Sequence, residues 1–198
     1  MKLHRNLLAL VCLTAPGFCA GGYAGAIGAL AGQKDLTPEN LIRSFAGFTY
    51  ELNAEPQDAE TFLQRKRGDC DDFANLASRL LTDRGYKTRL VAVMLEHQTH
   101  VVCYVEEGRG FLDFNHRADA QPIIKSDGSL EDIAQKVAGD FRSHWRTASE
   151  IRYTNKVPVY LEIVFAPAMV TPAARQKRHG TNDVVFDSAG VGGGNRLR

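Results

Sequence analysis

Three side chains in the sequence could together carry out nucleophilic catalysis. Cys70 follows Gly68 and Asp69 at the predicted start of a helix, where unpaired N–H groups and the helix dipole stabilise a thiolate. His100 opens a predicted strand and could act as the base. Asp113 lies between two apolar residues and needs a partner, because an unpaired buried carboxylate is costly. If its strand lies beside that of His100, the carboxylate can orient the imidazole, and the three residues predict acyl transfer through a thiol.

Each of these residues also has an ordinary structural explanation. Cys70 could be a small core residue, and its acidic neighbours oppose a thiolate. A zinc site of Cys70, His100 and Asp113 is chemically possible, but it lacks the closely spaced ligand pair of such sites. His97 in a predicted turn and His116 after the Asp113 strand are read as loop residues. The case for catalysis therefore depends on the order and placement of the three residues together.

The elements that must position these residues follow from the hydrophobic pattern. Apolar residues recur from Phe73 at i, i+3, i+4, i+7 and i+8, which predicts an amphipathic helix that begins at Cys70. The predicted helices span residues 37–52, 58–64, 70–85 and 130–145, and the predicted strands span 88–96, 100–106, 110–114 and 157–165. This order predicts an α+β fold in which the catalytic helix packs on a mostly antiparallel sheet.

Strand alternation separates the two cysteines of the predicted domain. His100, Val102 and Tyr104 should face one side of the sheet, and Cys103 should face the other as a core residue. Two further cysteines precede residue 20 and leave with the signal peptide proposed below. A disulfide between Cys70 and Cys103 stays open at this level.

The two ends of the chain differ in composition from its centre. Residues 1–26 combine a basic start, an apolar run and small residues, which predicts a signal peptide cleaved after Ala26 or, alternatively, after Ala20. Export to the periplasm or the exterior follows, without stable membrane insertion after cleavage; an uncleaved N-terminal membrane anchor is the alternative. Residues 27–34 should be flexible, 35–168 should form the domain, and the basic, glycine-rich 169–198 should be a disordered tail. A net charge of +1 gives no case for a nucleic-acid partner.

Three short strings carry a resemblance to a known family. Gly68-Asp69-Cys70 before a helix, His100 followed by an alternating strand, and Leu112-Asp113 in the next strand resemble the transglutaminase-like superfamily. The continuation Asp71-Asp72-Phe73 is similar to its bacterial transglutaminase-like cysteine peptidase branch. The resemblance implies a papain/transglutaminase-like core and a cysteine peptidase that acts on a peptide or protein through a thioester, with no required cofactor.

The same resemblance suggests two further sites. Gln64 lies six residues before Cys70, the offset at which papain-like enzymes place an oxyanion donor, although it also reads as an exposed helix residue. Asp69 and Asp71 match positions that bind calcium in some bacterial peptidases of this branch, although helix capping and solvation explain them more simply. The chain departs from the family where Val102 replaces a frequent tryptophan and Phe114 replaces a frequent proline.

Other functions remain open from the sequence. A transglutaminase would pass the acyl group to an amine instead of water. An inactive binding module could keep the same fold, and a metal-binding structural protein could use the same acidic and histidine residues. The sequence indicates neither the identity of the substrate nor the oligomeric state.

Overall fold

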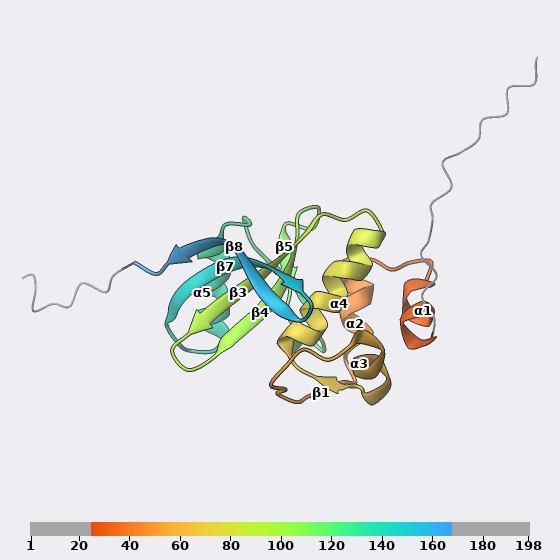
Figure 1. Ribbon diagram of the computed structural model, residues 1–198. Coiled ribbons are helices and arrows are strands. Elements are labelled where there is room, and N and C mark those ends of the chain that lie inside the picture. Colours follow the sequence, from red (N-terminus) through yellow and green to blue (C-terminus); the bar gives the residue numbers. More distant parts are fainter. Residues whose placement is uncertain (1–24, 168–198) are drawn as a thin grey trace, which may run out of the picture. The chain divides into compact units, whose positions relative to one another are not determined.

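A six-stranded antiparallel sheet forms the centre of the protein, and the computed structural model describes residues 25–167 (Figure 1). The strand order is β6-β5-β4-β3-β7-β8. Its members are β3 (Thr88–Leu95), β4 (Thr99–Val105), β5 (Gly110–Leu112), β6 (Ile123–Lys125), β7 (Trp145–Thr154) and β8 (Val157–Phe165). A separate parallel pair joins β1 (Thr49–Tyr50) to β2 (Arg67–Gly68).

Helices cover both faces of the sheet. They are α1 (Gly25–Ala31), α2 (Pro38–Arg43), α3 (Ala59–Arg65), α4 (Cys70–Asp83) and α5 (Leu130–Asp140), with a 3₁₀ turn, η1 (Phe114–His116). In Figure 1, α4 and the other N-terminal helices lie to one side of the sheet and α5 lies to the other. No described helix is long and apolar enough to cross a membrane.

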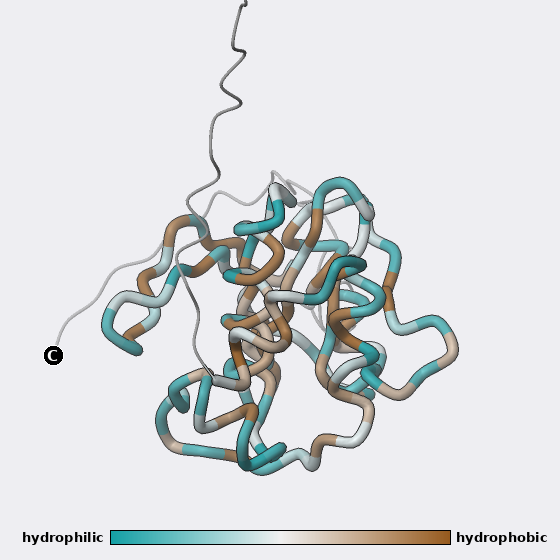
Figure 2. The backbone as a smooth tube through the Cα atoms, turned by 90° about the vertical axis from the view of Figure 1, so that its right-hand side faces the viewer, coloured by the Kyte–Doolittle hydropathy of each residue, from teal (hydrophilic) through white to brown (hydrophobic). Residues whose placement is uncertain are grey.

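The alternation of β4 divides the interior into two clusters. Val101 and Cys103 pack with α4, whereas Val102 and Tyr104 pack with α5. This confirms the predicted separation of the two faces, and Figure 2 shows apolar segments inside and hydrophilic turns outside. The predicted combination of helices with an antiparallel sheet is confirmed as well.

The helix that begins at Cys70 forms for the reason the sequence suggests. Its apolar stripe from Phe73 to Leu81 is buried, and such a stripe is stable because it removes apolar surface from water. The helix ends at Asp83, just before Gly85, which adopts a positive φ of +88°. The N-terminus of α4 thus lies at a fixed place beside the sheet.

Several boundaries differ from the sequence expectation. The helix expected over 37–52 ends at Arg43, and the following chain turns into β1. The helix expected over 130–145 ends at Asp140, because Arg142 takes a positive φ of +49° and Trp145 already begins β7. Part of the stretch expected to be flexible, 27–34, is helical in α1, where Leu30 is buried. The expected signal cleavage sites and tail fall mostly outside the described residues.

Candidate active site

Cys70 is the first residue of α4, and the local backbone explains how it gets there. Asp69 precedes it in an extended conformation, and the N–H of Asp69 donates to Asp72 Oδ2 over 3.2 Å. Gly68 allows this close approach, since a Cβ there would meet the Asp72 carboxylate and lie 2.6 Å from the Phe62 ring. Cys70 itself is 6% exposed and therefore buried at the helix start.

The two cysteines of the described chain are both free thiols. Cys103 is fully buried, and this burial raises its pKa to about 12. It is therefore a core residue, as strand alternation predicts.

His100 and Asp113 form a buried pair next to α4. His100 Nε2 lies 2.8 Å from Asp113 Oδ2, and both side chains are almost completely buried. The backbone N–H of Asn115 donates to Asp113 Oδ1 over 2.8 Å, so both carboxylate oxygens have a partner. The His100 ring packs edge-on against Phe141, with 4.8 Å between the ring centroids. These contacts fix the orientation of the imidazole.

The electrostatics of the pair favour an imidazolium and a carboxylate. Burial by itself lowers the pKa of His100, but the charge and hydrogen bond of Asp113, together with the Cys70 side chain, raise it to about 10. Burial would raise the pKa of Asp113, but His100 and the Asn115 N–H hold it below its usual value.

Cys70 completes the group. Its side chain lies near His100 and helps to raise the pKa of the imidazole. Since Nε2 already meets Asp113, Nδ1 is the ring nitrogen left for the sulfur. The structure therefore brings Cys70, His100 and Asp113 together in the order thiol, imidazole, carboxylate.

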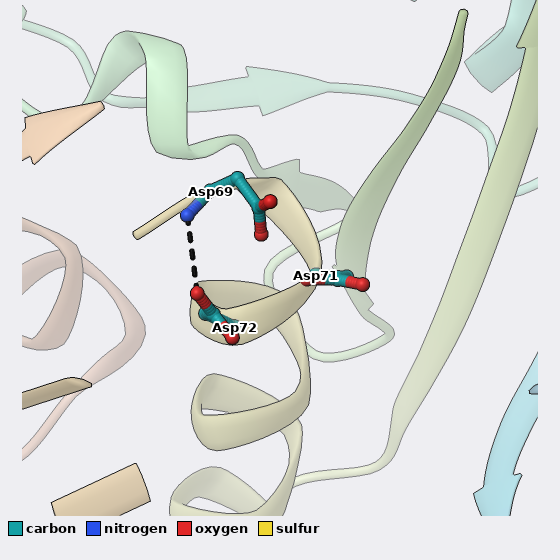
Figure 3. Close-up of side chains that lie close together, drawn as sticks. All are labelled: Asp69, Asp71 and Asp72. Carbon is teal, nitrogen blue, oxygen red and sulfur yellow. Dashed lines mark hydrogen bonds between the residues drawn. The ribbon is translucent and has the colours of Figure 1, made fainter. Parts of the chain in front are cut away.

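The acidic residues around Cys70 form a second cluster at the same helix start (Figure 3). Oxygens of Asp69, Asp71 and Asp72 all lie within 4.8 Å of one another. Asp69 Oδ1 and Asp71 Oδ1 are buried without a hydrogen-bond partner among the described residues. Burial and the neighbouring carboxylates raise the pKa of Asp71 to about 8. Two buried oxygens without donors suit a hard cation such as calcium.

Asp72 has a structural task that the sequence did not reveal. Its carboxylate accepts from the Gln57 backbone N–H over 2.6 Å and from the Gln57 side chain over 2.7 Å. It also accepts from the Asp69 N–H. Asp72 thus ties the segment before α3 to the start of α4.

The structure places the Gln64 side chain in contact with Glu60, a partner of α1, instead of with Cys70. Its side chain is exposed on α3 and donates to Glu60 Oε1 over 2.9 Å. Glu60 in turn accepts from Ala26 and Ile27 at the start of α1. Because its amide is engaged on the α1 side of α3, Gln64 is not placed with Cys70 as an oxyanion donor.

The side chains of the two other candidate histidines face solvent or contact other residues. His97 is exposed in the bend between β3 and β4. His116 joins η1 to α5, since its two ring nitrogens lie 2.7 Å from Asp119 Oδ2 and 3.0 Å from Asp140 Oδ2. The pKa of His116 is raised because these carboxylates and Asp113 outweigh its burial.

Two tyrosines near the thiol were not found from the sequence. Tyr50 in β1 packs beside Phe114, with 6.2 Å between the ring centroids. Tyr153 in β7 donates from its hydroxyl to Asp71 Oδ2 over 3.4 Å. Both come from segments far from Cys70 in the sequence, and neither belongs to a motif that spacing could reveal.

Comparisons with known proteins bear on this arrangement. The family model of the transglutaminase-like superfamily matches residues 36–121, which include Cys70, His100 and Asp113. A search of curated proteins found no match. Among solved structures, calcium-bound LapG of Legionella pneumophila is 15% identical, with a TM-score of 0.41 over 76% of this chain and 88% of that one. Residues 36–121 match the core of the transglutaminase-like superfamily, and this part of the chain has a transglutaminase-like fold.

Proposed function

We propose that this protein is a cysteine hydrolase that cleaves an amide bond of a peptide or protein through a thioester. Cys70 is the nucleophile, His100 the general acid and base, and Asp113 the residue that orients His100. The observation that carries the proposal is the buried 2.8 Å contact between His100 Nε2 and Asp113 Oδ2 beside the thiol at the start of α4. The family assignment of residues 36–121 supports the same chemistry.

The geometry suggests a complete reaction cycle. His100 Nδ1 holds the proton of Cys70, and the sulfur attacks the amide carbonyl to form a C–S bond. His100 then gives the proton to the departing amine as the C–N bond breaks, which leaves a thioester. Water attacks this thioester while His100 takes its proton, and the thiol and a carboxylic acid are released. Asp113 stabilises the imidazolium in each step.

Transfer to an amine would make the same site a transglutaminase. The first half of the cycle is unchanged, and only the second nucleophile differs. We propose hydrolysis because the Gly68-Asp69-Cys70-Asp71-Asp72 string is closest to the peptidase branch. Product analysis with and without an added primary amine separates the two.

We also propose that Asp69 and Asp71 hold a calcium ion. Their unpartnered, buried Oδ1 atoms provide hard oxygen ligands, and a cation there would offset the repulsion among the three carboxylates. The chemistry that calcium supplies is charge neutralisation. Cys70 and His100 perform the reaction itself.

The cellular setting is a proposal from the sequence. A signal peptide over residues 1–26 would export the protein to the periplasm or the exterior, where peptide or protein substrates are available. An uncleaved anchor would keep the domain at the membrane surface instead. No nucleic-acid partner is proposed.

Thiol alkylation tests the site without knowledge of the substrate. We expect iodoacetamide to modify Cys70 at pH 7, and we expect His100→Ala to slow this at least about tenfold, as for loss of general-base assistance. Cys103 is an internal control because it is fully buried. Peptide mapping by mass spectrometry identifies the modified residue. Slow labelling of Cys70 that does not depend on His100 would favour an inactive binding module.

Cleavage of a peptide library then tests the reaction. The wild-type protein should produce new amino termini that Cys70→Ala does not produce. Brief reaction followed by acid quenching should trap an acyl adduct on Cys70, and its mass identifies the acyl side of the substrate. Metal that copurifies and is lost in Cys70→Ser would instead support a structural metal site.

A further inference from the structure

We propose that Tyr50 is a catalytic residue whose hydroxyl donates a hydrogen bond to the oxyanion formed on the substrate carbonyl. The inference rests on the proposed function and adds a residue to the same site. It starts from the place of Tyr50 in the fold, between the two segments that carry Cys70 and Asp113.

The parallel pairing of β1 with β2 brings Tyr50 to the cysteine segment. Tyr50 lies opposite Gly68, two residues before Cys70, and the Glu51 N–H donates to the Gly68 carbonyl over 2.8 Å. On its other side, the Tyr50 ring packs against Phe114, which directly follows Asp113. The ring is therefore held between the start of α4 and the end of the Asp113 strand.

The hydroxyl of Tyr50 is available to a substrate. The side chain is 42% exposed, and among residues 25–167 its hydroxyl has no hydrogen-bond partner. Tyr153, the other tyrosine near the thiol, already donates to Asp71. Tyr50 is thus the phenol beside Cys70 that still has a donor to offer.

The surroundings also keep Tyr50 in the donor form. Partial burial, followed by electrostatic interactions with Cys70, Asp69, Asp71 and Asp113, raises its pKa to about 12. The phenol therefore keeps its proton throughout the neutral range. The hydroxyl can therefore donate a hydrogen bond to an oxyanion that forms on the substrate within its reach, although the surrounding residues are acidic.

An oxyanion site of this kind usually combines two donors. The backbone N–H of Cys70 is one, because the first N–H groups of a helix have no partner within the helix. Gln64, the residue expected from the sequence to be the second, is engaged with Glu60. Tyr50, which lies beside Gly68 in the paired strand, fills this role.

Two reactions of the same sulfur separate this role from a structural one. Alkylation by iodoacetamide forms a C–S bond as iodide leaves, and it passes through no oxyanion. Acylation by 4-nitrophenyl acetate forms a C–S bond through a tetrahedral oxyanion, breaks the ester C–O bond and releases 4-nitrophenolate. Both are measured at pH 7 as rates at Cys70, after subtraction of the background in Cys70→Ala.

We expect Tyr50→Phe to slow acylation by about 10- to 100-fold, which is at or below the usual effect of removing one oxyanion donor from an enzyme. The rate of alkylation should stay within about twofold of wild type. Tyr160→Phe is the matched control, because Tyr160 lies exposed on β8 outside the site. It should leave both rates unchanged. Thermal unfolding checks that the variants are folded.

Two results would overturn the inference while the proposed function stands. Tyr50→Phe could leave both rates unchanged, in which case the phenol does not contact the oxyanion. It could also slow both reactions equally, in which case Tyr50 acts on the thiol or on the shape of the site. If the proposed function itself were wrong, the results would differ. Cys70 of the wild-type protein would then not be acylated, and His100→Ala would not change its rate of alkylation.

Discussion

At the residue scale, the candidate site depends on a charged pair that is almost fully removed from water. Burial of two charges is costly, and it is tolerated when each keeps good hydrogen bonds. The Asp113 carboxylate accepts hydrogen bonds from His100 and from the Asn115 N–H. His100 contacts Asp113 through Nε2, and Cys70 lies near the ring. Removal of one partner leaves the other as an uncompensated buried charge.

The pair should give the fold a distinct pH dependence. The pKa of His100 is raised from 6.5 to about 10 in the folded protein, so its contribution is fully present below pH 6.5 and is lost as the pH rises through about 10. The pKa of Asp113 is lowered, so its contribution is present above pH 3.8 and is lost as the pH falls through its folded value. The wild-type pair should therefore stabilise the fold most between about pH 4 and 6.5.

Asp113→Asn tests this at three pH values. We expect it to lower the free energy of unfolding by about 3 kcal/mol at pH 6, since it breaks a buried ion pair. The loss should shrink towards pH 10, and urea titrations at pH 6, 8 and 10 measure it. Asp35→Asn, at an exposed carboxylate, is the control and should change little. A loss that is equal at all three pH values would contradict an ionised pair.

At the element scale, strand register explains why His100 and Asp113 meet. Cys103 pairs with Leu112 across β4 and β5, so the chain that continues past β5 places Asp113 on the same face of the sheet as His100. The two positions are diagonal neighbours, which long side chains can bridge. The start of α4 is set by contacts instead of periodicity, through Gly68 and Asp72.

Gly68→Ala should disturb this helix start. Its Cβ would meet the Phe62 ring and the Asp72 carboxylate, and Phe62 is fully buried. We expect a loss of about 1–3 kcal/mol in the free energy of unfolding, typical of overpacking, together with slower alkylation of Cys70. Gly139→Ala is the matched control, because nothing lies within 4 Å of its Cβ in the exposed part of α5. It should stabilise by up to about 1 kcal/mol. Equal effects of the two variants would show that Gly68 has no special packing role.

The first turn of α4 should also respond to calcium. Three carboxylates within 4.8 Å repel one another, and a bound cation would relieve this repulsion. We expect millimolar calcium to raise the Tm of the folded protein, and a chelator to reverse the rise. Magnesium at equal concentration is the control for ionic strength, and Asp71→Asn should remove most of the calcium effect. A Tm that is the same with calcium, with magnesium and in Asp71→Asn would contradict the proposed site.

At the scale of the whole molecule, the sequence could predict those helices and strands whose apolar residues recur with a regular period. Cys70 has a helix period after it, and His100 begins an alternating strand, so their elements could be placed from the sequence. Tyr50 could not be found this way, because a two-residue strand has no period and its partner Gly68 is distant in the chain. The contacts of His116 could not be found for a similar reason, since its partner Asp140 lies on another helix. For Gln64, the offset from Cys70 spans the end of α3, β2 and the start of α4, and such an offset does not determine which way the side chain points.

The fold also bears on the mature N-terminus. Cleavage after Ala26 would remove the first two residues of α1, where the Ala26 N–H donates to Glu60 Oε1 over 2.8 Å. Cleavage after Ala20 would keep this contact and the whole of α1. Retention of an ordered helix that packs on α3 favours the earlier site.

We therefore expect the exported protein to begin at Gly21, which intact-mass analysis of the secreted or periplasmic protein can determine. A chain that starts at Ile27 should unfold at a lower temperature than one that starts at Gly21, because α1 loses its first two residues and the hydrogen bond of the Ala26 N–H to Glu60. Glu60→Gln in the longer chain is the matched control, since it weakens this hydrogen bond while it keeps the helix. A mass that corresponds to a start at Ile27, with equal Tm values for the two chains, would contradict this role for α1. A mass that retains residues 1–20 would instead favour the uncleaved anchor.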